Sequence, residues 1–117
     1  MRLTAYVLAA VATLGMAPGK AGAAECSGVA PAISTCRMTF TASGGGVGSE
    51  SQLLMDGQVD AVATSPSGGR IEIHCRSSLL GSESCSHSLS GPFRAGETVT
   101  LVASAAGTGY WRVAASA

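Results

Sequence analysis

The segment TVTLVA, residues 98–103, determines the fold class of this chain. Every second residue from Val99 onward is apolar, so the apolar side chains fall on one face of an extended chain. The same period of two recurs in residues 37–42 and 70–75. This pattern is typical of half-buried β-strands. Since no later segment combines helix caps with a helical period, we expect a small all-β domain with an antiparallel sheet.

Turn-forming residues separate the expected strands. Glycine, proline, serine and aspartate recur as short clusters between the apolar runs, which favours many short strands joined by tight turns. The expected turns are Ser43–Gly46, Asp56–Gly57, Ser65–Gly69, Gly91–Pro92, Ala95–Gly96 and Gly107–Gly109. Residues 41–51 are so rich in glycine and serine that they predict a flexible loop or linker.

The amino-terminal residues have the three-part form of a signal peptide. Arg2 supplies a positive start, residues 3–17 are apolar, and small residues precede Glu25. The apolar run is shorter than the roughly 20 residues of a membrane span. We therefore expect a cleaved leader, residues 1–24, ending before Ala24 or Glu25, and a single secreted domain, residues 25–117, with no stable membrane insertion. The expected location is extracellular, or periplasmic.

Removal of that leader leaves a weakly acidic chain. The one lysine, Lys20, lies within it, so five arginines face seven acidic residues in the remainder. No basic run is present that would release counterions from a phosphate backbone. We therefore expect no nucleic-acid partner.

Four cysteines form two pairs of identical spacing, Cys26-x9-Cys36 and Cys75-x9-Cys85. An even number of cysteines in a short exported chain indicates a disulfide framework. Local pairing is favoured because it closes two equal loops that are rich in turn residues. Crossed pairing, which would tie together distant parts of the chain, is the open alternative.

Two stretches of the chain are similar to each other. Residues 55–73 and 95–113 each read as turn, strand, turn and strand, and a cysteine pair precedes each stretch. The pattern suggests two related halves, residues 25–74 and 75–117. The general pattern of β-hairpins produces the same similarity without duplication, so both explanations stay open.

Residues 57–111 resemble the internalin-type B-repeat, a bacterial repeat domain. The resemblance rests on VATSPSGGRIEIHC (residues 62–75), CSHSL (85–89) and FRAGETVTLVASAAG (93–107). The chain departs from the family pattern at Tyr110 and Trp111, which are adjacent. The resemblance implies a β-rich extracellular module with disulfides Cys26–Cys36 and Cys75–Cys85 and a role in adhesion or as a spacer.

The two histidines flank the second cysteine pair. Together His74, Cys75, Cys85 and His87 offer two thiols and two imidazoles, which formally suffice for a zinc site. Two arguments oppose this hypothesis: cysteines of an exported chain are normally oxidised, and His74 alternates out of phase with Cys75 on the expected strand. We therefore expect no metal and no cofactor.

A catalytic triad has little support in the sequence. Ser86 and Ser88 bracket His87, and Glu83 is near, but adjacent residues of a strand point to opposite faces. No nucleophile elbow and no phosphate-binding loop is present. We expect a chain that is not an enzyme.

The cluster Tyr110, Trp111 and Arg112 is the expected binding surface. Tyr, Trp and Arg are enriched at interface hot spots, although a core position is the simpler explanation for the one tryptophan. The sequence favours a secreted, non-enzymatic module for adhesion, spacing or surface presentation, with a protein or glycan surface as its partner. The alternative is a small secreted inhibitor or ligand-binding protein that uses the Cys75–Cys85 loop.

Overall fold

The computed structural model describes residues 20–78, 81 and 83–117, and this part of the chain is all-β with no helix. The expected fold class is confirmed. Residues 1–19 of the expected signal peptide, and Leu79, Leu80 and Ser82 of the Cys75–Cys85 loop, lie outside the described residues. The strands are β1 (Lys20–Ala21), β2 (Ala23–Ala30), β3 (Thr35–Thr41), β4 (Gly48–Thr64), β5 (Arg70–Ser77), β6 (Ser84–Ser90) and β7 (Thr98–Ser116).

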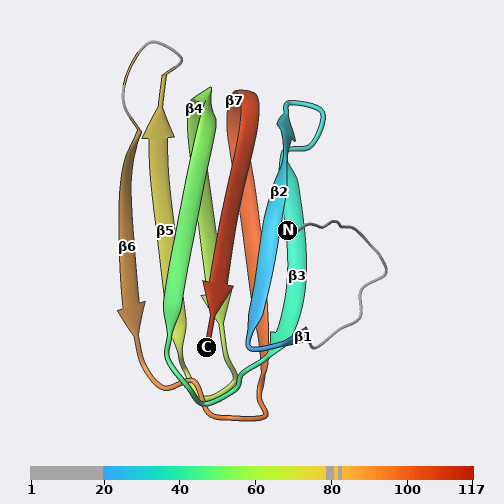
Figure 1. The fold of residues 1–117 in the computed structure, drawn as a ribbon, viewed down its shortest axis with the longest axis vertical. Coiled ribbons are helices and arrows are strands. Elements are labelled where there is room, and N and C mark those ends of the chain that lie inside the picture. The colour runs from blue at the N-terminus through green and yellow to red at the C-terminus, as the bar shows by residue number, and fades with distance from the viewer. Residues whose placement is uncertain (1–19, 79–80, 82) are drawn as a thin grey trace, which may run out of the picture.

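Strands β4 and β7 form a long antiparallel ribbon that bends back on itself. They have 17 and 19 residues and pair continuously from Gly48↔Ser116 to Thr64↔Thr100. Fully extended strands of this length would measure roughly 56 and 63 Å. The longest extent of the molecule is 41 Å. Figure 1 shows both strands turning at one end of the molecule and returning, so that their halves lie in two layers.

Glycines allow the bend. Gly57 pairs with Gly107, and their φ angles are 152° and 123°. A Cβ atom on Gly57 would lie 2.0 Å from the carbonyl oxygen of Ala106, and one on Gly107 would lie 2.1 Å from that of Asp56. The expectation of a chain-reversing turn between separate strands at these glycines was wrong. The ladder stays in register on both sides, so each strand changes direction without ending.

The ribbon has different neighbours in the two layers. In the first layer, β3 pairs with the first half of β7, and β5 and then β6 continue the sheet beyond the second half of β4. In the second layer, β2 pairs with residues 109–116 of β7, whose other neighbour is the first half of β4. β4 already begins at Gly48, so the loop expected over residues 41–51 is shorter, because its last residues join the β7 ladder.

The core lies between the two layers. As the period of two predicted, Val99, Leu101 and Ala103 are buried, and Ile71 and Ile73 join them from β5. The second layer contributes inward side chains of its own, which are Leu53, Met55, Trp111 and Val113. Full burial of a large apolar side chain stabilises a fold by about 1.5–3 kcal/mol.

On one side of the molecule, the edge strands of the two layers, β3 and β2, are joined by a disulfide and by main-chain hydrogen bonds. We call this the closed side. Here Cys26 of β2 is bonded to Cys36 of β3, which links the two layers. The other disulfide, Cys75–Cys85, joins the neighbouring strands β5 and β6 of the first layer. Both bonds confirm the local pairing. Below the first disulfide, Gly22 N–H donates to Thr41 O (2.7 Å) and Ala117 N–H donates to Gly22 O (3.0 Å). Residues 20–24 of the expected leader thus form β1 and the start of β2.

On the opposite side of the molecule, the edge strands of the two layers are β6 and the first half of β4. We call this the open side. Among the described residues, β6 pairs only with β5, and residues 48–56 of β4 pair only with β7. Every residue of β6 is exposed. In the described part of the chain, each contact across this side involves at least one side chain, and His87 and Cys85 are among them.

The two similar stretches take different places in this arrangement. Residues 55–73 form the second half of β4, a turn and β5, whereas 95–113 include most of β7 on both sides of its bend. A duplication remains a prediction.

Candidate functional site

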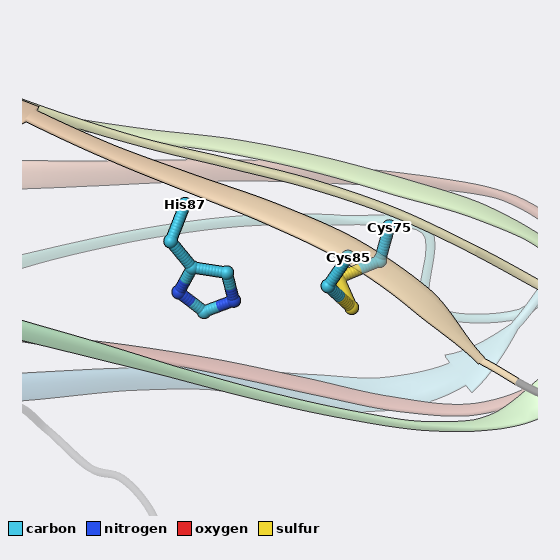
Figure 2. A group of neighbouring side chains, drawn as sticks. All are labelled: Cys75, Cys85 and His87. Atoms are coloured by element: carbon cyan, nitrogen blue, oxygen red, sulfur yellow. A yellow bond between two sulfur atoms is a disulfide. The ribbon is translucent and has the colours of Figure 1, made fainter.

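Cys75, Cys85 and His87 form a group at the open side. Cys75 pairs directly with Cys85 across the β5–β6 ladder, with their Cα atoms 4.1 Å apart. His87 lies two residues after Cys85, so the period of two places both side chains on the same face of β6. Figure 2 shows the disulfide and the imidazole side by side on this face. Their possible ligand atoms, the two sulfurs and a ring nitrogen, all lie within 4.8 Å of one another.

Two serines of β4 face the imidazole. The Oγ atom of Ser49 lies 2.6 Å from Nδ1 of His87, and that of Ser51 lies 3.1 Å from Nε2. The Ser51 hydroxyl is also 3.2 Å from Sγ of Cys85. Both serines come from the segment that the sequence predicted as loop or linker. The bend in β4 brings this segment to the open side.

Glu83 lies beside this group. Its Oε1 accepts a hydrogen bond from Leu53 N–H (2.9 Å), a free donor on the edge of β4, and its Oε2 lies 3.2 Å from Sγ of Cys85. Glu83 is not one of the four ligand residues expected from the sequence. The spacing Glu83-x-Cys85-x-His87, with its period of two, is the signal that would have identified it.

His74 is not part of this group. It points away from the core, and its Nδ1 and Nε2 lie 2.7 Å from Oδ1 of Asp60 and 3.1 Å from Oε1 of Glu72. The structure therefore does not bring together the four residues of the formal ligand set. The reason is the alternation of strand faces, which separates His74 from Cys75.

His74 belongs to a charged cluster on the outer face of the first layer. Asp60 and Glu72, which accept hydrogen bonds from the ring, raise the pKa of His74. Arg70 and then His74 hold the pKa of Glu72 below its usual value. The cluster borders a shallow depression that Val62, Val102 and Ser104 also line. It is exposed to solvent, so its ion pairs contribute little to stability.

The structure separates the three residues of the expected binding surface. Trp111 has no exposed area, and its Nε1 donates a hydrogen bond to Ile33 O (2.9 Å). Arg112 points outward and lies 2.9 Å from Glu25 and 3.3 Å from Glu50. Burial opposes the charge of Arg112, but these two carboxylates raise its pKa. Tyr110 lies on the same outer face as Arg112, because the two are separated by two positions in β7.

Tyr110 lies at the centre of an apolar row that the sequence did not predict. It pairs with Val29 of β2 on one side and with Leu54 of β4 on the other. Val29 is 56% exposed and Leu54 is 62% exposed. The row crosses all three strands of the second layer. Arg112 lies in the next outward row, and its carboxylate partners Glu25 and Glu50 flank Ala114 one outward row further along. No local pattern predicts this row, because it depends on the register of three strands.

The environment of His87 lacks the third member of a catalytic triad. Ser86 and Ser88, its neighbours in sequence, alternate to the other face of β6. The ring instead lies between two hydroxyls, and within the described part of the chain no carboxylate contacts it. A serine nucleophile activated by histidine needs such a group to orient the imidazole.

Comparison of the chain with protein-family models, curated proteins and solved structures gave no match. Across residues 20–78, 81 and 83–117, no helix has the length and apolar character needed to span a membrane.

Proposed function

We propose that this chain is a secreted, non-enzymatic binding module of the adhesion or surface-presentation kind, and that it binds an extracellular protein through the Val29–Tyr110–Leu54 row. The observation that carries the proposal is this apolar row on one sheet face, in which Val29 and Leu54 are exposed and Tyr110 is half-buried between them. The resemblance of residues 57–111 to B-repeats supports the same role.

The composition and shape of the face support a protein partner. A central aromatic ring between two exposed aliphatic side chains gives a contiguous apolar area, of the kind found at the centre of protein interfaces. Arg112, Glu25 and Glu50 provide charged groups at its margin. The backbone that carries Tyr110 is also held in place, because the next residue, Trp111, packs into the core and Arg112 after it forms ion pairs.

Two disulfides support an extracellular location. Each ten-residue closure restricts the unfolded chain, and such bonds persist in oxidising compartments.

The test is capture from the extracellular proteins of the host's surroundings, with the oxidised chain as bait and quantitative detection of each captured protein. Truncation of a central aromatic contact commonly costs about 2 kcal/mol or more, which corresponds to roughly thirty-fold weaker binding. We expect Tyr110→Ala and Leu54→Ala to lose the same captured protein. Val102→Ala, which removes an exposed side chain from the outer face of the other layer, is the matched control and should retain it.

A capture pattern that is unchanged in Tyr110→Ala and Leu54→Ala would contradict the proposal. Binding to immobilised glycans that depends on Tyr110, without any captured protein, would replace the protein partner by a carbohydrate.

A second candidate is a secreted inhibitor that acts through the Cys75–Cys85 loop and the strand that follows it. The full exposure of β6 favours it, since an unpaired edge can add a strand to a partner. An inhibitor of this kind would lose its target in a Leu89→Pro variant of β6 and keep it in Tyr110→Ala.

A further inference from the structure

We propose that Cys75, Cys85, His87 and Glu83 form a zinc site when the Cys75–Cys85 disulfide is reduced. The site is distinct from the Val29–Tyr110–Leu54 row and does not depend on the function proposed for it. In the oxidised chain the two sulfurs are bonded to each other and hold no metal.

The spacing of the donor atoms fits a tetrahedral ion. Zinc binds thiolate at about 2.3 Å and imidazole at about 2.0 Å, which places neighbouring ligands roughly 3.5 Å apart. The sulfurs and the ring nitrogen already lie within 4.8 Å of one another. Oε2 of Glu83 is 3.2 Å from Sγ of Cys85. Reduction lets the two sulfurs separate. The carboxylate of Glu83 lies near Cys85 but outside the group of three, so its side chain must rotate toward the ion to supply the fourth ligand.

The contacts of His87 prepare one nitrogen for a metal. A ligating histidine normally donates its other ring N–H to an oxygen acceptor, which fixes the tautomer and the ring orientation. Ser49 Oγ is such an acceptor, 2.6 Å from Nδ1. Nε2 then faces Ser51, whose hydroxyl lies 3.1 Å from Nε2 and 3.2 Å from Sγ of Cys85. Rotation of this one hydroxyl opens the space between nitrogen and sulfur.

The other disulfide offers no such site. Cys26 and Cys36 have no histidine beside them, and His74 lies on the outer face with Asp60 and Glu72. Within the described residues, Cys75, Cys85 and His87 are the group of ligand-type side chains close enough to share an ion. Cys75 of β5 is buried, but Cys85 and His87 lie on the exposed edge strand β6, which gives reductant and metal a path to the disulfide.

The conversion is balanced with a dithiol as reductant. The dithiol gives two electrons and two protons to the Cys75–Cys85 bond. The S–S bond breaks, two cysteine thiols form, and the dithiol is oxidised to its own disulfide. Zn²⁺ then binds both sulfurs as thiolates and releases the two protons. Binding is therefore expected to weaken as the pH falls.

The experiment measures zinc bound per chain, by competition with a chromogenic chelator, for the oxidised full chain and for the chain reduced with a phosphine. We expect about one zinc per reduced chain and none per oxidised chain. The substitutions Cys26→Ser and Cys36→Ser together should retain the site, whereas Cys75→Ser and Cys85→Ser together should abolish it. Far-ultraviolet circular dichroism of each sample shows whether the strands persist.

The matched pair His87→Ala and His74→Ala separates this site from zinc bound to an unfolded, reduced chain. In an unfolded chain His74, next to Cys75, is as good a ligand as His87. In the folded site His87→Ala should weaken zinc binding at least ten-fold, and His74→Ala should leave it unchanged. Equal effects of the two substitutions, uptake by the oxidised chain, or no uptake by the reduced chain would each overturn the proposal.

Discussion

Gly57 of β4 lies directly opposite Gly107 of β7, at the rung where the ribbon passes from one layer to the other. Each glycine leaves the space that the partner's backbone occupies: a Cβ atom on either would meet a carbonyl oxygen at 2.0 or 2.1 Å. Two long strands therefore share a single bend, and both layers depend on it.

Alanine at either bend position should destabilise the fold strongly. Gly57→Ala or Gly107→Ala forces two backbones apart and imposes an unfavourable φ angle, so we expect the free energy of unfolding to fall by more than about 2 kcal/mol. Urea denaturation checks this. Gly46→Ala is the control, because no atom lies within 4 Å of its added Cβ, and it should change stability by less than about 0.5 kcal/mol. Similar stabilities for all three variants would contradict the shared bend.

Trp111 and Tyr110 should differ in their effects on stability. Trp111→Ala removes a side chain with no exposed area together with its hydrogen bond to Ile33, and we expect a loss of about 3–5 kcal/mol. Tyr110→Ala should cost far less, because Tyr110 lies on the outer face. Thermal denaturation of both variants provides the comparison. The core assignment fails if Trp111→Ala melts at the wild-type temperature.

The protonation of His74 should depend on Asp60. Hydrogen bonding to Asp60, and then to Glu72, raises the pKa of His74 above its usual value of 6.5. Because the folded state binds this proton more tightly, protonated His74 stabilises the fold. This stabilisation is fully present below the unfolded-state pKa and is lost as the pH rises through the folded-state pKa. Nuclear magnetic resonance titration of the ring should show a lower pKa in Asp60→Asn. The same titration in Glu50→Gln, a change in the other layer, should match the wild type.

Residues 20–24 should contribute to stability if export leaves them on the chain. A chain that starts at Glu25 lacks the main-chain hydrogen bonds from Gly22 to Thr41 and from Ala117 to Gly22, and also the ladder pairing of residues 20–21 with β3 and of 23–24 with β7. At about 0.5–1.5 kcal/mol for each bond, the two bonds of Gly22 alone amount to about 1–3 kcal/mol, so we expect the shorter chain to be less stable than one that starts at Lys20 by at least this much. Amino-terminal sequencing of the exported protein identifies which form exists. Equal stability of the two forms would show that β1 adds nothing.

The sequence predicts the fold class and the disulfides well because both depend on local patterns. The period of two identified the inward residues of β3, β5 and β7, and the equal spacing of the cysteines favoured the pairing found. The bend at Gly57 and Gly107 could not be predicted in the same way. A glycine in a turn and a glycine inside a bent strand look alike in sequence, and only the register between two distant strands distinguishes them.

The candidate site was predicted in part for the same reason. Cys85 and His87 are close in sequence, whereas Ser49 and Ser51 lie 38 and 34 residues from their partners His87 and Cys85. Their contact arises only after β4 has folded back. Likewise, Tyr110 was recognised from its residue type, but Val29 and Leu54 join it through the ladders of β2 and β4.

The closed side and the open side differ in the interactions that must break before the two layers can separate. At the closed side a covalent bond and main-chain hydrogen bonds join the edges, so separation requires rupture of the Cys26–Cys36 bond or loss of β1 and β2. Among the described residues, each contact at the open side depends on a side chain: Ser49 and Ser51 contact His87, Ser51 also contacts Cys85, Glu83 contacts Leu53, and Ser77 contacts Met55. Local opening therefore has a preferred direction: β6 lifts first, as a unit tied to β5, and amide hydrogens of the first half of β4 exchange before those of β3.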